Sequence, residues 1–188
     1  MENYEEDIYS RRVGFGYRFG ALVIDVVILM VLGYVFKMIL GIKDPTPEEL
    51  MEGMEPGNID MGAMMLTSMK ASLISYVVGL LYTSTEIFLR KTPGKMALGL
   101  IVTDENGNTP ATNAMIIRYL FKQASTIFIV LAVLLNIGSL IWIGSLLGVV
   151  FLIGCFFTFG EKRMGFHDML AKTAVYKEKE LAELQQHS

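Results

Sequence analysis

The chain has 188 residues, of which 53% are hydrophobic and only 19% are charged, and its mean hydropathy is +0.47. This composition excludes an ordinary soluble enzyme domain, in which about a quarter of the residues are charged. The formal net charge of −3, with no basic patch on a soluble domain, excludes a nucleic-acid-binding protein. The charges are clustered and leave long uncharged runs, which indicates that lipid surrounds much of the chain.

The N-terminal segment, residues 1–17, is polar and precedes the first apolar segment. Four acids and three arginines occupy the first eighteen residues, without a cleavable signal pattern. We therefore expect the apolar segment that follows, at about 19–42, to remain in the membrane as an anchor. It contains two charged residues, Asp25 and Lys37.

A second apolar segment runs from about 71 to 89 and contains one charge, Glu86. No charged side chain then occurs between Gln123 and Gly160. A single helix needs only about 20 residues to cross the hydrocarbon, so this stretch is long enough for two passes. We expect helices at about 113–135 and 140–159.

Asn136, Gly138 and Ser139 supply turn residues between these two passes. The alternative, one long tilted helix in a three-pass protein, leaves the excess length unexplained. The predicted fold is therefore all-α: an integral membrane four-helix bundle that forms a single domain over residues 1–188.

The placement of lysine and arginine predicts the orientation. Thirteen of them lie in the first eighteen residues, in the loop after the second pass together with the start of the third pass, and in the tail 161–188, whereas only two lie in the loop 43–70. Cytoplasmic segments carry the excess of such residues. We therefore expect both termini in the cytoplasm and a multi-pass protein of a bacterial-type inner membrane, with the lipid bilayer as its first partner.

The segment between the second and third passes is neither membrane nor disordered. Thr92–Lys95 is a turn, Met96–Val102 is apolar, and Asn106-Gly107 is a strong tight-turn signal. We expect a short interfacial helix or a small hairpin on the cytoplasmic side.

Three stretches carry a recognisable pattern: Tyr17–Asp25, Thr92–Val102 and Lys162–Thr173. Together they resemble the RDD family of membrane proteins, over about residues 12–176. The resemblance implies that Arg18 and Asp25 are the first two of the family's named residues. It also implies that Asp168 is the third, with Asp104 as the alternative.

The RDD family is thought to transport unknown ligands, and cation–proton exchange has been attributed to some members. The resemblance therefore implies a transporter of this kind. The long Met-rich outer loop is a departure from the family pattern.

Ionisable residues inside a membrane are expensive, so they are functional candidates by default. Five ionisable residues fall at a similar depth on three helices, and we expect them to form one charge cluster: Arg18, Asp25, Glu86, Arg118 and Lys122. Two interpretations stay open for Asp25. It is either a proton or cation site, or half of a structural pair that locks the helices. Glu86 is near enough to the interface to reach water instead.

The adjacent His167 and Asp168 follow the last pass. Without a nucleophile nearby they do not form a catalytic dyad, so no catalytic residue and no enzyme activity are predicted. We expect Asp168 to attach the tail to the loop after the second pass, through Lys95 or Arg90.

The loop 43–70 is rich in methionine, with Met51, Met54, Met61 and Met64 spaced as two Met-x-x-Met pairs. Thioethers bind copper(I), but an adaptable surface on the membrane or on a partner protein is the simpler interpretation. Cys155 shares no ligand spacing with either histidine. No resident metal or cofactor is expected.

Small residues four positions apart allow helices to pack closely, within the bundle or between copies. Such pairs occur in the fourth pass, at Gly144 and Gly148, and in the second, at Ser75 and Gly79. The leading hypothesis is a small transporter that exchanges a monovalent cation for a proton, with a homo-oligomer as one expected form. The alternative is a membrane-embedded accessory or regulatory subunit that binds another membrane protein. An intramembrane protease or transferase is the third.

Overall fold

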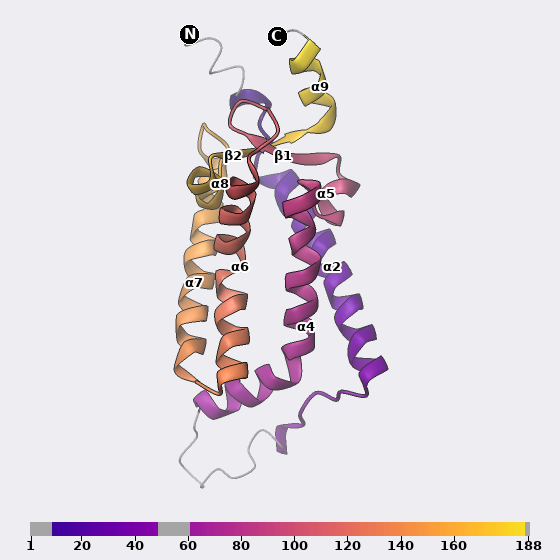
Figure 1. Cartoon of the computed structure of the whole chain (residues 1–188), viewed down its shortest axis with the longest axis vertical. Helices are drawn as coiled ribbons and strands as arrows, with labels where there is room; N and C mark the ends of the chain where they lie inside the picture. The colour runs from indigo at the N-terminus through magenta and orange to yellow at the C-terminus, as the bar shows by residue number, and fades with distance from the viewer. Residues whose placement is uncertain (1–8, 49–60, 187–188) are drawn as a thin grey trace. The chain divides into compact units, whose positions relative to one another are not determined.

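The computed structural model describes residues 9–48 and 61–186, and within them four helices are long and apolar enough to cross a membrane (Figure 1). These spans are Phe15–Leu40, Ser72–Leu89, Thr112–Leu135 and Ser139–Phe159. They agree within a few residues with the four predicted passes, so the all-α membrane fold is confirmed. A two-stranded sheet is added to it.

The elements follow in chain order as α2 (Phe15–Leu40), α4 (Met61–Leu89), α5 (Pro93–Ala97), β1 (Leu100–Asp104), α6 (Thr112–Leu135), α7 (Ser139–Phe156), the short 3₁₀ helix Phe157–Phe159, α8 (Phe166–Ala171), β2 (Thr173–Lys177) and α9 (Glu178–Gln186). Large apolar side chains such as Met30, Tyr34, Leu81 and Phe88 cover the outside of the long helices. Such a surface is typical of a protein that faces lipid.

The uncharged stretch after Gln123 folds as two helices joined by a tight turn. α6 ends at Leu135, and Asn136 adopts a left-handed conformation with φ 55°. The amide of Ile137 then donates to the carbonyl of Ala132 at 3.0 Å. Asparagine tolerates this conformation, which satisfies the last carbonyls of a helix. The prediction of two passes rather than one long helix is confirmed.

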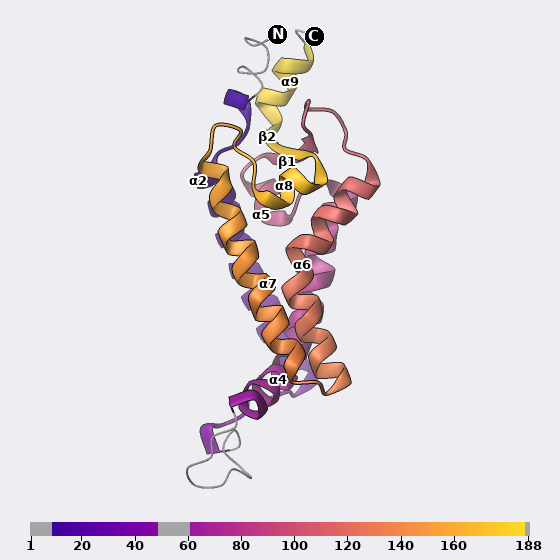
Figure 2. The same cartoon turned by 90° about the vertical axis from the view of Figure 1, so that its left-hand side faces the viewer.

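α4 begins at Met61, inside the segment that was expected to be a loop up to residue 70. The sequence there is rich in methionine, alanine and leucine, which favour helix, and contains no proline to interrupt it. Figure 1 shows the first turns of α4 at an angle to the rest of the helix, and Figure 2 shows the same turns after a rotation of 90°. Met51 and Met54 lie outside the described residues.

The described residues form two compact units, each made of pieces of several helices. One unit consists of Leu29–Leu81 and Gln123–Gly148. Its helices approach closely at small residues: a Cβ on Gly144 would lie 3.1 Å from the carbonyl oxygen of Ser125. The Gly144–Gly148 seam therefore packs within this unit.

The other unit consists of the chain up to Ile28, Tyr82–Lys122 and Val149 onward. It contains the antiparallel pair of β1 and β2, in which Val102 faces Val175. The amide of Val13 donates to the carbonyl of Val175 at 2.8 Å, so the N-terminal segment lies along the other edge of β2.

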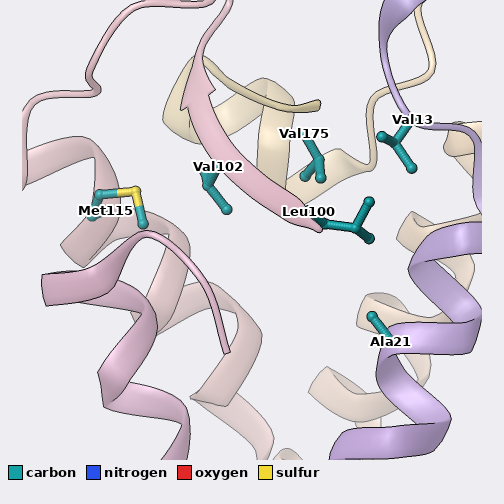
Figure 3. Close-up of a cluster of buried hydrophobic side chains, with 6 residues drawn as sticks. All are labelled: Val13, Ala21, Leu100, Val102, Met115 and Val175. Carbon is teal, nitrogen blue, oxygen red and sulfur yellow. The ribbon is translucent and has the colours of Figure 1, made fainter. Parts of the chain in front are cut away.

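One face of this sheet carries the core of the unit. Figure 3 shows Leu100 of β1 between Val13 of the N-terminal segment and Ala21 of α2. Val102 and Val175 lie on the same face of the sheet. The opposite face presents Ala174 and Tyr176, against which Tyr9 and Leu181 of α9 pack. The sheet thus joins the N-terminal segment, the loop between α4 and α6, and the tail.

The segment after the second pass contains the expected short helix, α5. The hairpin alternative is wrong, because β1 pairs with β2 of the tail and not with a neighbouring strand. The Asn106-Gly107 turn does form: the amides of Asn106 and Asn108 donate to the Asp104 carboxylate, and Gly107 has φ 85°. This turn ends β1 and leads the chain toward α6.

Candidate functional site

Asp25 lies on α2 and is surrounded by neutral hydrogen-bond donors. Its carboxylate accepts from the hydroxyl of Tyr82 at 2.6 Å, the hydroxyl of Thr92 at 2.6 Å and the amide of Gly94 at 2.7 Å. The residue is 8% exposed. A carboxylate with three donors is well satisfied without a counter-ion. Asp25 therefore connects α2 to the end of α4 and to the start of α5.

The sequence Thr92-Pro93-Gly94-Lys95 explains how α5 reaches Asp25. Thr92 is the N-cap, and proline follows at the first position, where its missing N–H costs nothing. A Cβ on Gly94 would lie 2.3 Å from the carbonyl oxygen of Ala21 and 2.7 Å from Asp25 Cγ. Only glycine permits this approach of the α5 backbone to α2.

Glu86, near the end of α4, is contacted by three cations. Its carboxylate pairs with the ammonium groups of Lys95 and Lys122, and with Arg118 Nε at 3.2 Å. Glu86 is 3% exposed. The alternative that it reaches water at the interface is therefore wrong, because α5 and α6 cover it with their cations.

Asp168 is fully buried on α8 and contacts two arginines. One carboxylate oxygen pairs with Arg18 of α2, and the other pairs with Arg118 of α6. The amide of Gly165 also donates to Asp168 at 2.9 Å, which closes the first turn of α8. Because Arg118 contacts both Asp168 and Glu86, these ion pairs are continuous.

We refer to the six connected residues as the charge network: Arg18, Glu86, Lys95, Arg118, Lys122 and Asp168. Four cations face two carboxylates, so the fully ionised network holds two positive charges in excess. Buried charges are costly unless paired, and an unbalanced set favours either loss of a proton or uptake of an anion.

Four of the five residues that the sequence predicted as one cluster belong to the charge network: Arg18, Glu86, Arg118 and Lys122. Asp25 does not, since its hydrogen-bond partners among the described residues are the neutral groups of Tyr82, Thr92 and Gly94. The interpretation of Asp25 as half of an ion pair is therefore wrong about the partner, which is not a cation. Asp25 does connect α2 to α4 and α5, through neutral donors. Asp168 joins the network through arginines, and not through Lys95 or Arg90 as expected.

Lys95, which the sequence places in a turn and offers as a partner of Asp168, pairs with Glu86 instead. It follows the second pass by a few residues, and the chain reverses at Thr92–Gly94 to bring it back to Glu86. Burial lowers the pKa of the Lys95 ammonium from 10.5 to about 7, and Glu86 opposes this shift. Lys95 is therefore partly deprotonated near neutral pH.

His167 adjoins the network, with its Nε2 atom 3.5 Å from a carboxylate oxygen of Asp168. Burial, followed by the positive charges of Arg118, Lys122 and Arg18, holds the pKa of this imidazole well below its usual range. The ring is neutral at pH 7 and packs against Phe151, with ring centroids 5.4 Å apart.

Arg12 is a second buried arginine that the sequence did not single out. Its guanidinium donates to the carbonyls of Glu105 and Lys162, to Met164 Sδ and to the Tyr176 hydroxyl. It connects the N-terminal segment, the loop after β1, the loop before α8, and β2. Ser10, Arg11 and Arg12 are three consecutive polar or basic residues, and nothing in their sequence indicates which of them is buried.

Comparison with known proteins identifies one related family. The family model described as the RDD family matches residues 12–172, which is most of the chain and includes Arg18, Asp25 and Asp168. No match was found among curated proteins or among solved structures.

Proposed function

The chain belongs to the RDD family, and on this premise we propose that it is a small multi-pass membrane transporter that exchanges a monovalent cation for a proton at Glu86 and Lys95. The observation that carries the proposal is the burial of Glu86 beside a lysine whose pKa is about 7. An ionisable group of this kind in a membrane protein indicates a functional site.

The exchange follows from the charge balance of the network. When the Lys95 ammonium gives its proton to water, the nitrogen keeps the electron pair and Glu86 loses one of its three cations. A monovalent cation can then occupy the vacated position beside the carboxylate. One positive charge leaves as another arrives, so the excess charge of the buried network is unchanged. A cation bound without proton release would increase that excess.

The location and orientation are part of the same proposal. The distribution of lysine and arginine favours an inner-membrane protein with both termini in the cytoplasm. The hydrogen bond between Val13 and Val175 supports the placement of the N-terminal segment and the tail on the same side.

Replacement of Lys95 by arginine tests the exchange. Arginine keeps a cation against Glu86 but does not release its proton in the accessible pH range. We expect Lys95→Arg protein to fold and to lose nearly all cation-driven pH change in vesicles that contain the purified protein, with sodium, potassium and lithium tested in turn. Glu86→Gln should lose it as well.

The matched control is Lys91→Arg, because Lys91 pairs with Glu178 at the surface. This variant should transport as the wild type does. Full exchange in Lys95→Arg would refute the assignment of the exchange site.

The alternative, an accessory subunit of another membrane protein, is favoured by one observation. Asp25 is held by three donors in a way that suits a fixed scaffold. If folded wild-type protein in vesicles moves none of the three cations, the alternative is preferred, and a partner should co-purify after mild solubilisation.

A further inference from the structure

The short helix α5 contributes both to the hydrogen bonds around Asp25 and to the charge network. Two of the three donors to Asp25, the Thr92 hydroxyl and the Gly94 amide, belong to the start of α5. The next residue, Lys95, points to Glu86 instead. The same turn of chain therefore contacts a carboxylate on α2 and a carboxylate on α4.

The Thr92 hydroxyl has two partners, which makes the connection specific. It donates to Asp25 at 2.6 Å and accepts from the backbone amide of Lys95 at 3.4 Å. A hydroxyl has a single proton to donate, so its donation to Asp25 leaves its lone pairs free for the amide. The orientation of Thr92 toward Asp25 thus also defines the first turn of α5, from which the Lys95 side chain extends.

We propose that Asp25 is a positioning residue that holds α5 against α2, through Thr92 and Gly94, so that the Lys95 ammonium stays buried beside Glu86. This inference rests on the proposed function and adds how the exchange site is controlled. A proton or a monovalent cation that binds the Asp25 carboxylate competes with these donors, and the loss of their hydrogen bonds releases α5. Lys95 then gains access to water.

The effect is geometric and does not depend on the charge of Asp25. Within the described part of the chain, the charged groups with the largest effect on Lys95 are Glu86 of α4 and Lys122 and Arg118 of α6. If Asp25 acted by its charge, its neutralisation would lower the Lys95 pKa. Release of α5 has the opposite effect, because burial is the largest cause of the lowered value.

The test measures Lys95 directly, without transport. Protein labelled with ¹³C-lysine is titrated in detergent micelles, and the Cε chemical shift reports the protonation of each lysine amine. Lys95→Arg identifies the Lys95 signal. In Thr92→Val, a variant of nearly the same shape that cannot hydrogen-bond, we expect the Lys95 midpoint to rise by at least about one pH unit toward its ordinary value. Asp25→Asn should shift the midpoint in the same direction.

Two further variants separate positioning from general damage. Thr92→Ser keeps the hydroxyl and should restore the wild-type midpoint. Thr158→Val makes the same substitution at a buried threonine whose hydroxyl donates only locally, to the carbonyl of Cys155 at 2.7 Å, and should leave Lys95 unchanged.

The outcomes distinguish this inference from the proposed function. A wild-type midpoint near 10 would refute the exchange site itself. A wild-type midpoint near 7 that stays there in Thr92→Val and Asp25→Asn would refute the positioning role and leave the exchange standing. A fall of the midpoint in Asp25→Asn would show that Asp25 acts by charge, which also refutes positioning.

Discussion

At the scale of single residues, the contact between α2 and α5 depends on the absence of a side chain at position 94. An alanine Cβ there would meet the Ala21 carbonyl oxygen at 2.3 Å and Asp25 Cγ at 2.7 Å. Both neighbours belong to α2, and the carbonyl is part of its backbone, so α5 has to move away. We expect Gly94→Ala to lower the free energy of unfolding by roughly 1–3 kcal/mol, as overpacking does in well-packed cores.

Thermal unfolding in detergent measures this effect, and Gly16→Ala is the matched control. A Cβ on Gly16 meets no other group within 4 Å, so the control should unfold at or slightly above the wild-type temperature. Equal unfolding temperatures for Gly94→Ala and wild type would show that α5 is not held against α2 as described.

At the scale of elements, Arg12 links the N-terminal segment to three segments that lie far from it in the chain. Its guanidinium has a partner in each of these three segments, and a lysine ammonium cannot reach all three, because its three donors sit on one nitrogen. We expect Arg12→Lys to destabilise the protein almost as much as Arg12→Met. Each buried polar group left without a partner costs about 1–3 kcal/mol.

The measurement is the unfolding temperature together with the rate of protease cleavage in the tail after β2. Both Arg12 variants should unfold earlier and be cleaved faster. Lys162→Met removes an exposed cation but keeps the backbone carbonyl that accepts from Arg12, so it should behave as wild type. A stable Arg12→Lys protein would show that the charge of Arg12 matters and its geometry does not.

The elements themselves were largely predictable from the sequence, and their pairings were not. Uncharged runs and the Asn136 turn define the four passes, because lipid tolerates few charges. The pairing of β1 with β2 joins residues about seventy positions apart, and no local pattern encodes it. The depth of Glu86, Arg118 and Lys122 along their helices predicted that they would meet.

The neutral donors around Asp25 were missed because a search for charges does not find hydroxyls and backbone amides. The arginine partners of Asp168 were missed for a different reason. The fold of the chain after the last pass decides which cations α8 reaches, and that fold depends on the tail joining the sheet as β2. Lys95 could have been found from its neighbours, since a turn directly after a membrane helix brings the next residues back to that helix.

At the scale of the whole molecule, the lowered pKa of Lys95 makes stability depend on pH. The folded protein binds the Lys95 proton with a pKa of about 7, against 10.5 for an ordinary lysine. Between these values the unfolded chain carries more protons than the folded one, so the free energy of unfolding rises with pH. The stabilisation is complete above about pH 10.5 and is lost as the pH falls toward 7. One proton contributes at most about 1.4 kcal/mol per pH unit.

Thermal unfolding between pH 7 and pH 9 is the measurement, and the comparison of slopes isolates Lys95. The unfolding temperature of wild-type protein should rise with pH across this window, whereas Lys95→Met, which has no amine to titrate, should show a flatter dependence. Lys91→Met removes a surface lysine paired with Glu178 and should keep the wild-type slope. Because His167 titrates well below its usual range, its contribution falls at more acidic pH and does not overlap this window. Identical slopes in wild type and Lys95→Met would mean that Lys95 keeps its proton in the folded state, and the proposed exchange at Glu86 would then lack its proton donor.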